Sequence, residues 1–309
     1  MFERILLPLD GSEIAEKSLL YAEEIASKFG SEIILFLARG YISSENEHIR
    51  QTYLDGLVEV IKSNLQKNDA EGVKVTSIIQ EGEPAQNICN WVVQNKIDLI
   101  IMTVISLSGL KIGKMLGTVA DHVCRNVPIP VMLVKPQNIP SISHLDKLIS
   151  NILIPLDGSE LSKRALPIGE KLGSRLKAQI TLFQMARMIY PHVAVNYDGI
   201  IDYGKFGEWQ EQNVEQPKFN EREVQIVHEE MIVVEAELKE KGLNVTHTVQ
   251  SGTDAANEII EISKEVNADL VIMATHGRYG LDRLILGSVT EKVLWYGKTP
   301  LLLVNARAV

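Results

Sequence analysis

The 309-residue sequence is poor in cysteine, in long apolar runs and in excess basic charge. Its two cysteines, Cys89 and Cys124, are too few for a disulfide framework or a cysteine-based metal cluster, and they fit a reducing compartment such as the cytoplasm. No apolar run approaches the roughly 20 residues that cross a bilayer, and the first residues lack the layout of a signal peptide. The formal net charge of −9 argues against non-specific nucleic-acid binding. We therefore expect a cytoplasmic protein with neither membrane insertion nor a nucleic-acid partner.

Several motifs of enzymes are also absent. The sequence has no Gly-x4-Gly-Lys-[Ser/Thr] segment, which excludes a P-loop NTPase. Asp10-Gly11-Ser12, after the first expected strand, has one glycine and therefore lacks the dinucleotide-binding fingerprint. No nucleophile, base and carboxylate stand at a spacing typical of catalysis, so the sequence assigns no catalytic residue and no metal ligand.

What the sequence does contain is an internal repeat. ILLPLDGSE at residues 5–13 returns as ILIPLDGSE at residues 152–160, with eight of nine positions identical, 147 positions later. The later segments that match are 98–102 with 269–273 and 130–134 with 300–304. Gly117 corresponds to Gly287, 170 positions later, so the second half has gained 23 residues, most of them within residues 186–221. The sequence therefore predicts two related domains, residues 1–140 and 148–309, with an insertion in the second.

Within each half, strand and helix patterns alternate. The short apolar runs at 5–9 and 152–156 are typical of strands buried on both faces, and Ser12 and Ser159 are natural N-caps for the helices that follow. Gly30 stands at a helix C-cap. The other expected elements are strands at 32–37, 73–80, 179–184 and 244–250 and helices at about 55–66 and 224–239 and after Pro84 and Asp254. This pattern predicts an α/β fold: two tandem doubly wound domains, each a five-stranded parallel sheet flanked by helices.

The loop after the fourth expected strand of the second half contains the residue types that hold phosphate. Residues 273–277, MATHG, are followed at 287–290 by GSVT, which opens a helix. Such a loop presents backbone N–H groups and the positive end of the helix dipole beyond the carboxyl ends of the strands, where ligands bind in doubly wound sheets. The alternative is that Ser288 is only an N-cap and Gly277 only a turn residue, and the loop alone leaves both open.

These motifs resemble the universal stress protein family. The family signature is Gly, two residues, Gly, nine residues, Gly, then Ser or Thr, and this chain keeps the spacing as Ala274-x2-Gly277-x9-Gly287-Ser288. Residues 155–159, PLDGS, match the family's first-strand motif. Ala274 departs from the signature, which has glycine at this position. Alanine keeps the backbone N–H donor, but it adds a methyl group and does not easily adopt positive φ.

The resemblance implies that the second half binds ATP or a related adenine nucleotide, with or without Mg²⁺. It implies that Asp157, after Pro155 and Leu156, meets the ribose or the adenine edge and that Met185 lines the adenine pocket. The residues implied to contact the ribose and the phosphates are Met273, Ala274, His276, Gly277, Gly287, Ser288, Val289 and Thr290.

The equivalent loop of the first half has lost these features. Thr103 and Ser106 replace the two leading glycines, the spacing to Gly117 has slipped by one, and Val104 and Ile105 introduce branched side chains. Asp10 is retained. We therefore expect residues 1–140 to form a degenerate domain with little or no ATP binding.

Family members commonly dimerise through the fifth strand, whose outer edge is otherwise unpaired. Here residues 130–134 and 300–304 stand on one chain, so we expect them to pair with each other as an intramolecular pseudo-dimer, with a higher homo-oligomer left open. The insertion at 186–221 follows Met185 and is expected to form a mobile cover over the nucleotide site, or else to pack on the first domain or a partner.

The resemblance favours a nucleotide-responsive stress factor that acts on an unknown protein partner. If the protein hydrolyses ATP, we expect it to do so slowly, since no lysine finger, acid pair or positioned base is identifiable. Two other functions remain as alternatives: an adenylate-forming or nucleotidyl-transferring enzyme on the same architecture, and an ATP-independent interaction protein.

Overall fold

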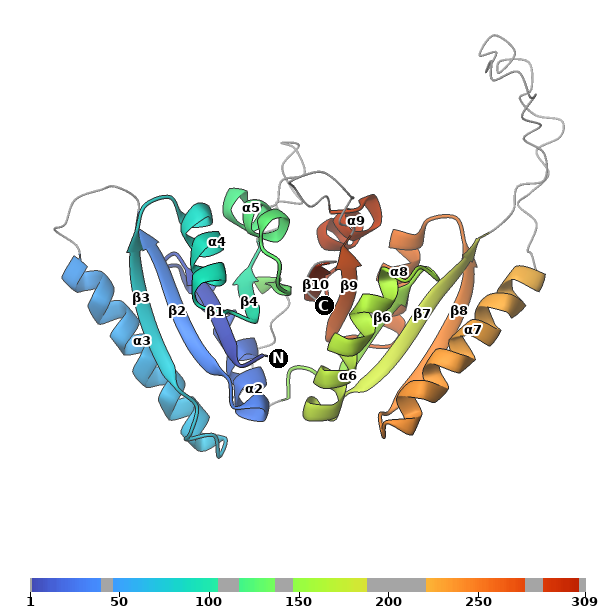
Figure 1. The fold of residues 1–309 in the computed structure, drawn as a ribbon, viewed down its shortest axis with the longest axis horizontal. Coiled ribbons are helices and arrows are strands. Elements are labelled where there is room, and N and C mark those ends of the chain that lie inside the picture. Colours follow the sequence, from blue (N-terminus) through green and yellow to red (C-terminus); the bar gives the residue numbers. More distant parts are fainter. Residues whose placement is uncertain are drawn as a thin grey trace, which may run out of the picture.

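The computed structural model describes residues 2–39, 47–104, 117–136, 147–187, 221–275 and 286–305. Within them a central sheet carries helices on both faces (Figure 1). The elements of the first half are β1 (Arg4–Leu9), α1 (Glu13–Glu16), α2 (Leu19–Phe29), β2 (Glu32–Arg39), α3 (Glu47–Lys67), β3 (Val75–Glu81), α4 (Pro84–Gln94), β4 (Leu99–Thr103), α5 (Thr118–Asn126) and β5 (Val131–Val134).

The second half repeats this order. Its elements are β6 (Asn151–Leu156), the short 3-10 helix η3 (Ser162–Arg164), α6 (Ala165–Leu176), β7 (Gln179–Arg187), α7 (Glu221–Glu240), β8 (Val245–Gly252), α8 (Ala255–Glu265), β9 (Leu270–Thr275), α9 (Ser288–Tyr296) and β10 (Leu301–Asn305). The predicted alternation of strands and helices is confirmed in both halves.

The described strands form a single sheet with the order β3-β2-β1-β4-β5-β10-β9-β6-β7-β8. Within each half all neighbouring strands are parallel, as the alternation predicts. The two five-stranded sheets are nevertheless continuous, because β5 and β10 pair directly.

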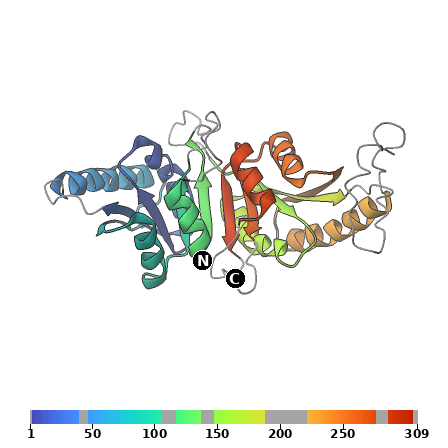
Figure 2. The same ribbon diagram turned by 90° about the horizontal axis from the view of Figure 1, so that it is seen from above.

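The seam between the halves is the antiparallel pair β5 and β10. Leu302 lies opposite Met132, with Leu301 opposite Leu133 and Leu303 opposite Val131. This register relates the halves by a pseudo-two-fold axis, and Figure 2 shows them side by side on either side of the pair. The pairing between the two fifth strands is the one predicted from the sequence, and it covers the strand edges that would otherwise be exposed.

Each face of the sheet has one hydrophobic core that crosses the seam. One core lies under α2, α3, α6 and α7 and includes Met132 and Leu302, both fully buried. The other lies under α4, α5, α8 and α9 and includes Leu133 and Leu301. Because both cores contain residues of both halves, the two repeats share their apolar packing as well as their sheet.

The first helix of each half begins differently from the prediction. Ser12 accepts a hydrogen bond from the Ala15 N–H at 3.1 Å, but it caps only the four-residue α1, and α2 starts separately at Leu19. In the second half Ser159 accepts from the Ser162 N–H at 3.1 Å in the turn that leads to η3, and α6 starts only at Ala165. Local side-chain hydrogen bonds compete with the helix ladder here.

Several boundaries extend beyond the prediction. α3 and α7 begin before residues 55 and 224, because their first turns are polar and lack the apolar period that marks the buried face. Gly30 ends α2 with φ of 71°, as predicted. β7 runs through Arg187 and α7 begins at Glu221, so the ends of the predicted insertion belong to regular elements. The rest of that segment, with its predicted cover over the site, lies outside the described residues.

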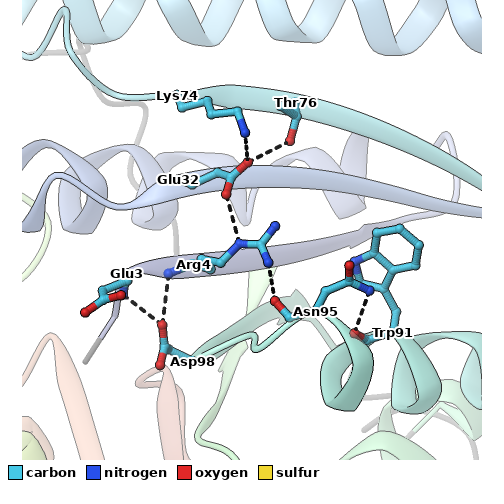
Figure 3. A network of polar contacts seen from close by, with 8 residues as sticks. All are labelled: Glu3, Arg4, Glu32, Lys74, Thr76, Trp91, Asn95 and Asp98. Atoms are coloured by element: carbon cyan, nitrogen blue, oxygen red, sulfur yellow. Dashed lines mark hydrogen bonds and ion pairs between the residues drawn. The ribbon is translucent and has the colours of Figure 1, made fainter.

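A network of charged side chains ties the amino ends of the first-half strands together (Figure 3). Glu32 accepts from Arg4 Nε through Oε2 and pairs with Lys74 Nζ through Oε1, both at 2.8 Å. Asp98 Oδ2 accepts from the backbone N–H groups of Glu3 and Arg4 at 3.0 and 3.1 Å. In the second half the positions equivalent to Arg4 and Glu32 are the neutral Asn151 and Gln179. The network lies at the amino edge of the sheet, away from the edge where ligands bind in such folds.

We expect Glu32→Gln to make the protein less stable at pH 7 but not near pH 3. Partial burial raises the pKa of Glu32, but hydrogen bonds from Lys74 and Arg4 outweigh this effect and hold the pKa below the ordinary value of 4.5. The carboxylate therefore stabilises the fold above about pH 4.5, and this contribution is lost as the pH falls further. Urea unfolding should show a loss of about 1 kcal/mol at pH 7, and a loss of the same size at pH 3 would contradict the assignment. Gln179→Ala at the equivalent neutral position serves as the pH-independent control.

Candidate functional site

The structure places the described part of the predicted contact set at the carboxyl edge of the second half's sheet. β6 stands between β7 and β9 in the sheet order, and the helices that follow β6 and β7 lie on the opposite face from α8 and α9. The ends of β6, β7 and β9 and the start of α9 therefore meet where the direction of winding changes, which is the usual ligand position in open α/β sheets.

Asp157 forms a tight turn directly after β6. Its Oδ1 accepts hydrogen bonds from the Ser159 N–H at 3.0 Å and the Ser159 hydroxyl at 2.5 Å. Gly158 in this turn has φ of 78°, a conformation that favours glycine. Asp10 makes the same turn with Ser12 in the first half, at 2.9 and 2.6 Å. The aspartate turn is thus a shared structural feature and does not by itself distinguish the two halves.

Met185 lies within β7, two residues before the strand ends, and is half-buried against the core under α8 and α9. A Cβ added to Gly252 would lie 3.0 Å from Met185 Sδ and 2.9 Å from Glu258 Oε1. The ends of β7 and β8 and the first turn of α8 therefore converge on one spot. The equivalent positions in the first half are Ala38 and Gly82. No motif of the sequence predicts a role for Gly252 or Glu258, although the repeat aligns Gly252 with Gly82.

The end of β9 presents mainly backbone to this edge. Met273 is 7% exposed and its side chain is part of the core, so only its main chain is available to a ligand. Ala274 is half-buried and pairs with Val304 of β10. His276 and Gly277, which the resemblance assigns to the ribose and phosphates, lie outside the described residues.

The first turn of α9 is the most informative part of the site. Gly287 is the N-cap, with φ of −61° and ψ of 154°, and no side chain caps the turn within the described residues. Ser288 is exposed, Val289 is half-buried and Thr290 is buried. Ser288 is the first helical residue and Gly287 occupies the N-cap position. Gly277, the other residue for which a purely structural role was left open, lies outside the described residues.

The neighbouring helix α8 shows what α9 lacks. Asp254 caps α8, and its Oδ1 accepts from the backbone N–H groups of Ala256 and Asn257 at 3.1 and 3.4 Å. Its Oδ2 pairs with Lys292 Nζ of α9 at 2.9 Å, and this hydrogen bond from Lys292 lowers the pKa of Asp254. A carboxylate of the protein caps the start of α8, whereas no side chain of the described residues caps the start of α9, and an uncapped helix start is a typical position for a bound anion.

The first half has a comparable helix start but a different strand end. α5 begins after Gly117 and also lacks a side-chain cap among the described residues. Val104 directly follows β4, as predicted for a loop residue, but it is buried and its N–H donates to the Val134 carbonyl at 2.9 Å. Its counterpart Thr275 is equally buried, so the two halves do not differ at this position. Residues 105–116 lie outside the described part of the chain.

The described residues contain no cluster of three or more His, Cys, Asp or Glu side chains placed to hold a metal ion. Among the same residues, no helix has the length and apolar character needed to cross a membrane. Cys89 and Cys124 are both free and buried, as their apolar surroundings predict.

Comparisons with known proteins agree with the repeat and with the motifs. The model of the universal stress protein family matches residues 1–135 and again residues 149–305. Universal stress protein MJ0531 of Methanocaldococcus jannaschii is 28% identical over 160 residues, which is 52% of this chain and 84% of that protein. Universal stress protein YxiE of Bacillus subtilis is 26% identical over 149 residues, covering 44% of this chain and 100% of that protein.

A solved structure supports the fold over the whole length. The crystal structure of a universal stress protein from Archaeoglobus fulgidus has a TM-score of 0.66 to this chain at 20% identity, with 99% of each chain covered. At that identity the likeness concerns the fold alone, but the family model spans both halves. The chain therefore belongs to the universal stress protein family, with two family domains in tandem.

Proposed function

We propose that this protein binds ATP, or a related adenine nucleotide, in its second domain and thereby controls its interaction with a protein partner in the stress response. One observation supports this most strongly. α9 opens at Gly287 without a side-chain cap in the described structure, at the position where the chain keeps the spacing of the family signature. The backbone N–H groups of Ser288, Val289 and Thr290 then suit a phosphate chain.

The surrounding residues fit a nucleotide. Met185, Gly252 and Glu258 converge at the end of β7 and β8, where an apolar surface and a carboxylate would adjoin the base. Asp157 directly follows the adjacent strand β6, and we assign it to the ribose or the adenine edge. Bound Mg²⁺, where present, would accompany the triphosphate and screen its charge. The chain's own contribution is to orient the nucleotide along the strand ends.

We propose the domain limits 1–140 and 148–309, with ATP in the second domain only. Support comes from the first-half loop, where Thr103 and Ser106 replace the two leading glycines of the signature. It also comes from Ala38, a small residue at the position equivalent to Met185. Both cysteines are free and buried, which supports the proposal that the protein functions in the reducing cytoplasm. The first domain then serves as a structural or partner-facing copy.

Native mass spectrometry of gently purified protein tests this function against its alternatives. We expect one adenine nucleotide per chain, either retained or taken up on addition of ATP. Absence of any bound nucleotide at millimolar ATP would favour an ATP-independent interaction protein. Rapid release of pyrophosphate from added ATP would favour a nucleotidyl-transferring enzyme.

A further inference from the structure

Each half of the protein caps a helix of the other half across the seam. Lys135, just after β5, donates from Nζ to the Gly297 carbonyl and to the Val293 carbonyl at 3.4 Å, at the C-terminal end of α9. Asn305, at the end of β10, donates from Nδ2 to the Val127 carbonyl at 2.6 Å, at the C-terminal end of α5. Lys135 and Asn305 are 170 positions apart, the offset that also relates Val127 to Gly297. The two contacts are therefore reciprocal about the pseudo-two-fold axis.

The two caps differ in charge. Lys135 and Asn305 are each 4% exposed, but only Lys135 brings an ammonium group to the carbonyl end of a helix. Burial lowers the pKa of Lys135 to about 8, so the group is mainly protonated at neutral pH. It has no acidic partner among the described residues and is held by the α9 carbonyls. A cation at the C-terminus of a helix is the favourable arrangement for the helix dipole.

α9 joins this contact to the proposed nucleotide site. The helix has nine residues and is a rod roughly 13 Å long, with Gly287–Thr290 at one end and Gly297 at the other. Its N-terminal turn has no side-chain cap among the described residues, so its placement depends on packing and on its far end. Arg125 adds one contact at the rim, to Glu291 Oε1 at 3.5 Å across the seam.

We propose that Lys135, a residue of the first domain, is a positioning residue for the nucleotide site of the second domain. By holding the C-terminal carbonyls of α9 it fixes the first turn of that helix where the phosphates bind. The proposal rests on the proposed ATP site, and it assigns the first domain a part in a site whose other residues all belong to the second.

Lys135→Met in the full chain tests this, with Asn305→Leu as the matched control. Both changes remove one buried cap from the seam, so both should lower the thermal midpoint. We expect Lys135→Met to weaken ATP binding by about tenfold, and Asn305→Leu, whose cap holds the helix of the degenerate loop, to leave it within twofold. Lys135→Arg, which keeps a cationic donor, should restore most of the affinity. Equal affinity losses in Lys135→Met and Asn305→Leu, or none in either, would overturn the proposal.

Hydrogen exchange without nucleotide separates a failure of this inference from a failure of the ATP site. In the ligand-free protein, Lys135→Met should speed exchange of the hydrogen-bonded amides of residues 291–297, while Asn305→Leu should speed it in residues 121–127. If the wild-type protein does not bind ATP, the proposed function fails, but the exchange pattern still decides whether Lys135 holds α9. Unchanged exchange at residues 291–294, the first hydrogen-bonded amides of α9, in Lys135→Met would refute the positioning role.

Discussion

Replacing Gly287 by valine is expected to abolish ATP binding and leave the protein folded. Gly287 is the N-cap of α9, so a phosphate on the first turn would come against its main chain. A branched side chain there keeps the phosphate away from at least two charge-assisted backbone hydrogen bonds, worth roughly 3 kcal/mol or about a hundredfold in affinity. Calorimetric titration with ATP should show no measurable heat of binding at concentrations that saturate the wild-type protein.

The local backbone conformation allows this substitution without disturbing the fold. Gly287 has φ of −61° and ψ of 154°, a region that valine adopts without strain, so we expect a change in stability of no more than about 1 kcal/mol. Circular dichroism and the thermal midpoint should confirm a native fold. Wild-type affinity in a folded Gly287→Val protein would show that nucleotide does not bind at the start of α9.

Leu302→Ala is expected to destabilise both halves of the protein together. Leu302 is almost completely buried, lies opposite Met132 in the β5–β10 pair, and belongs to the core that spans both halves. Truncating a buried leucine costs roughly 2–5 kcal/mol because it leaves a cavity. Hydrogen exchange in increasing denaturant should lose protection in β1 and in β6 at the same, lowered concentration.

Leu302→Met provides the matched control for this experiment. It keeps the side-chain volume and should cost less than about 1.5 kcal/mol. If the halves were independent domains, Leu302→Ala would lower the midpoint of β6 and leave that of β1 unchanged. Such separate transitions would contradict a shared core.

Most of the fold follows from the repeat. The recurring strand motif, the alternation of elements and the two fifth-strand segments predict two parallel five-stranded sheets joined through β5 and β10, as observed. Helix starts were harder to predict, since Ser12 and Ser159 each bind a nearby N–H in a short turn before the main helix begins. The polar first turns of α3 and α7 gave no apolar period by which to place them.

The site was predictable where a residue acts through its position in the chain. The spacing from Ala274 to Ser288 and the turn at Asp157 both predict a site at the carboxyl edge of the second half's sheet, and the described residues of this set lie at that edge. Glu258 lies beside Gly252, and Asp254 pairs with Lys292. Each pair joins residues from different elements, so no local sequence pattern predicts it. Lys135 is harder still, since it acts on a helix 158 residues away in sequence.

The number of nucleotides bound per chain tests the central claim most directly. Calorimetric titration of the full-length protein with ATP should give a stoichiometry of one. Gly117→Val, at the position of the first domain equivalent to Gly287, should leave both stoichiometry and affinity unchanged, whereas Gly287→Val should remove binding. A stoichiometry of two, or a loss of binding in Gly117→Val that matches the loss in Gly287→Val, would contradict a single site in the second domain.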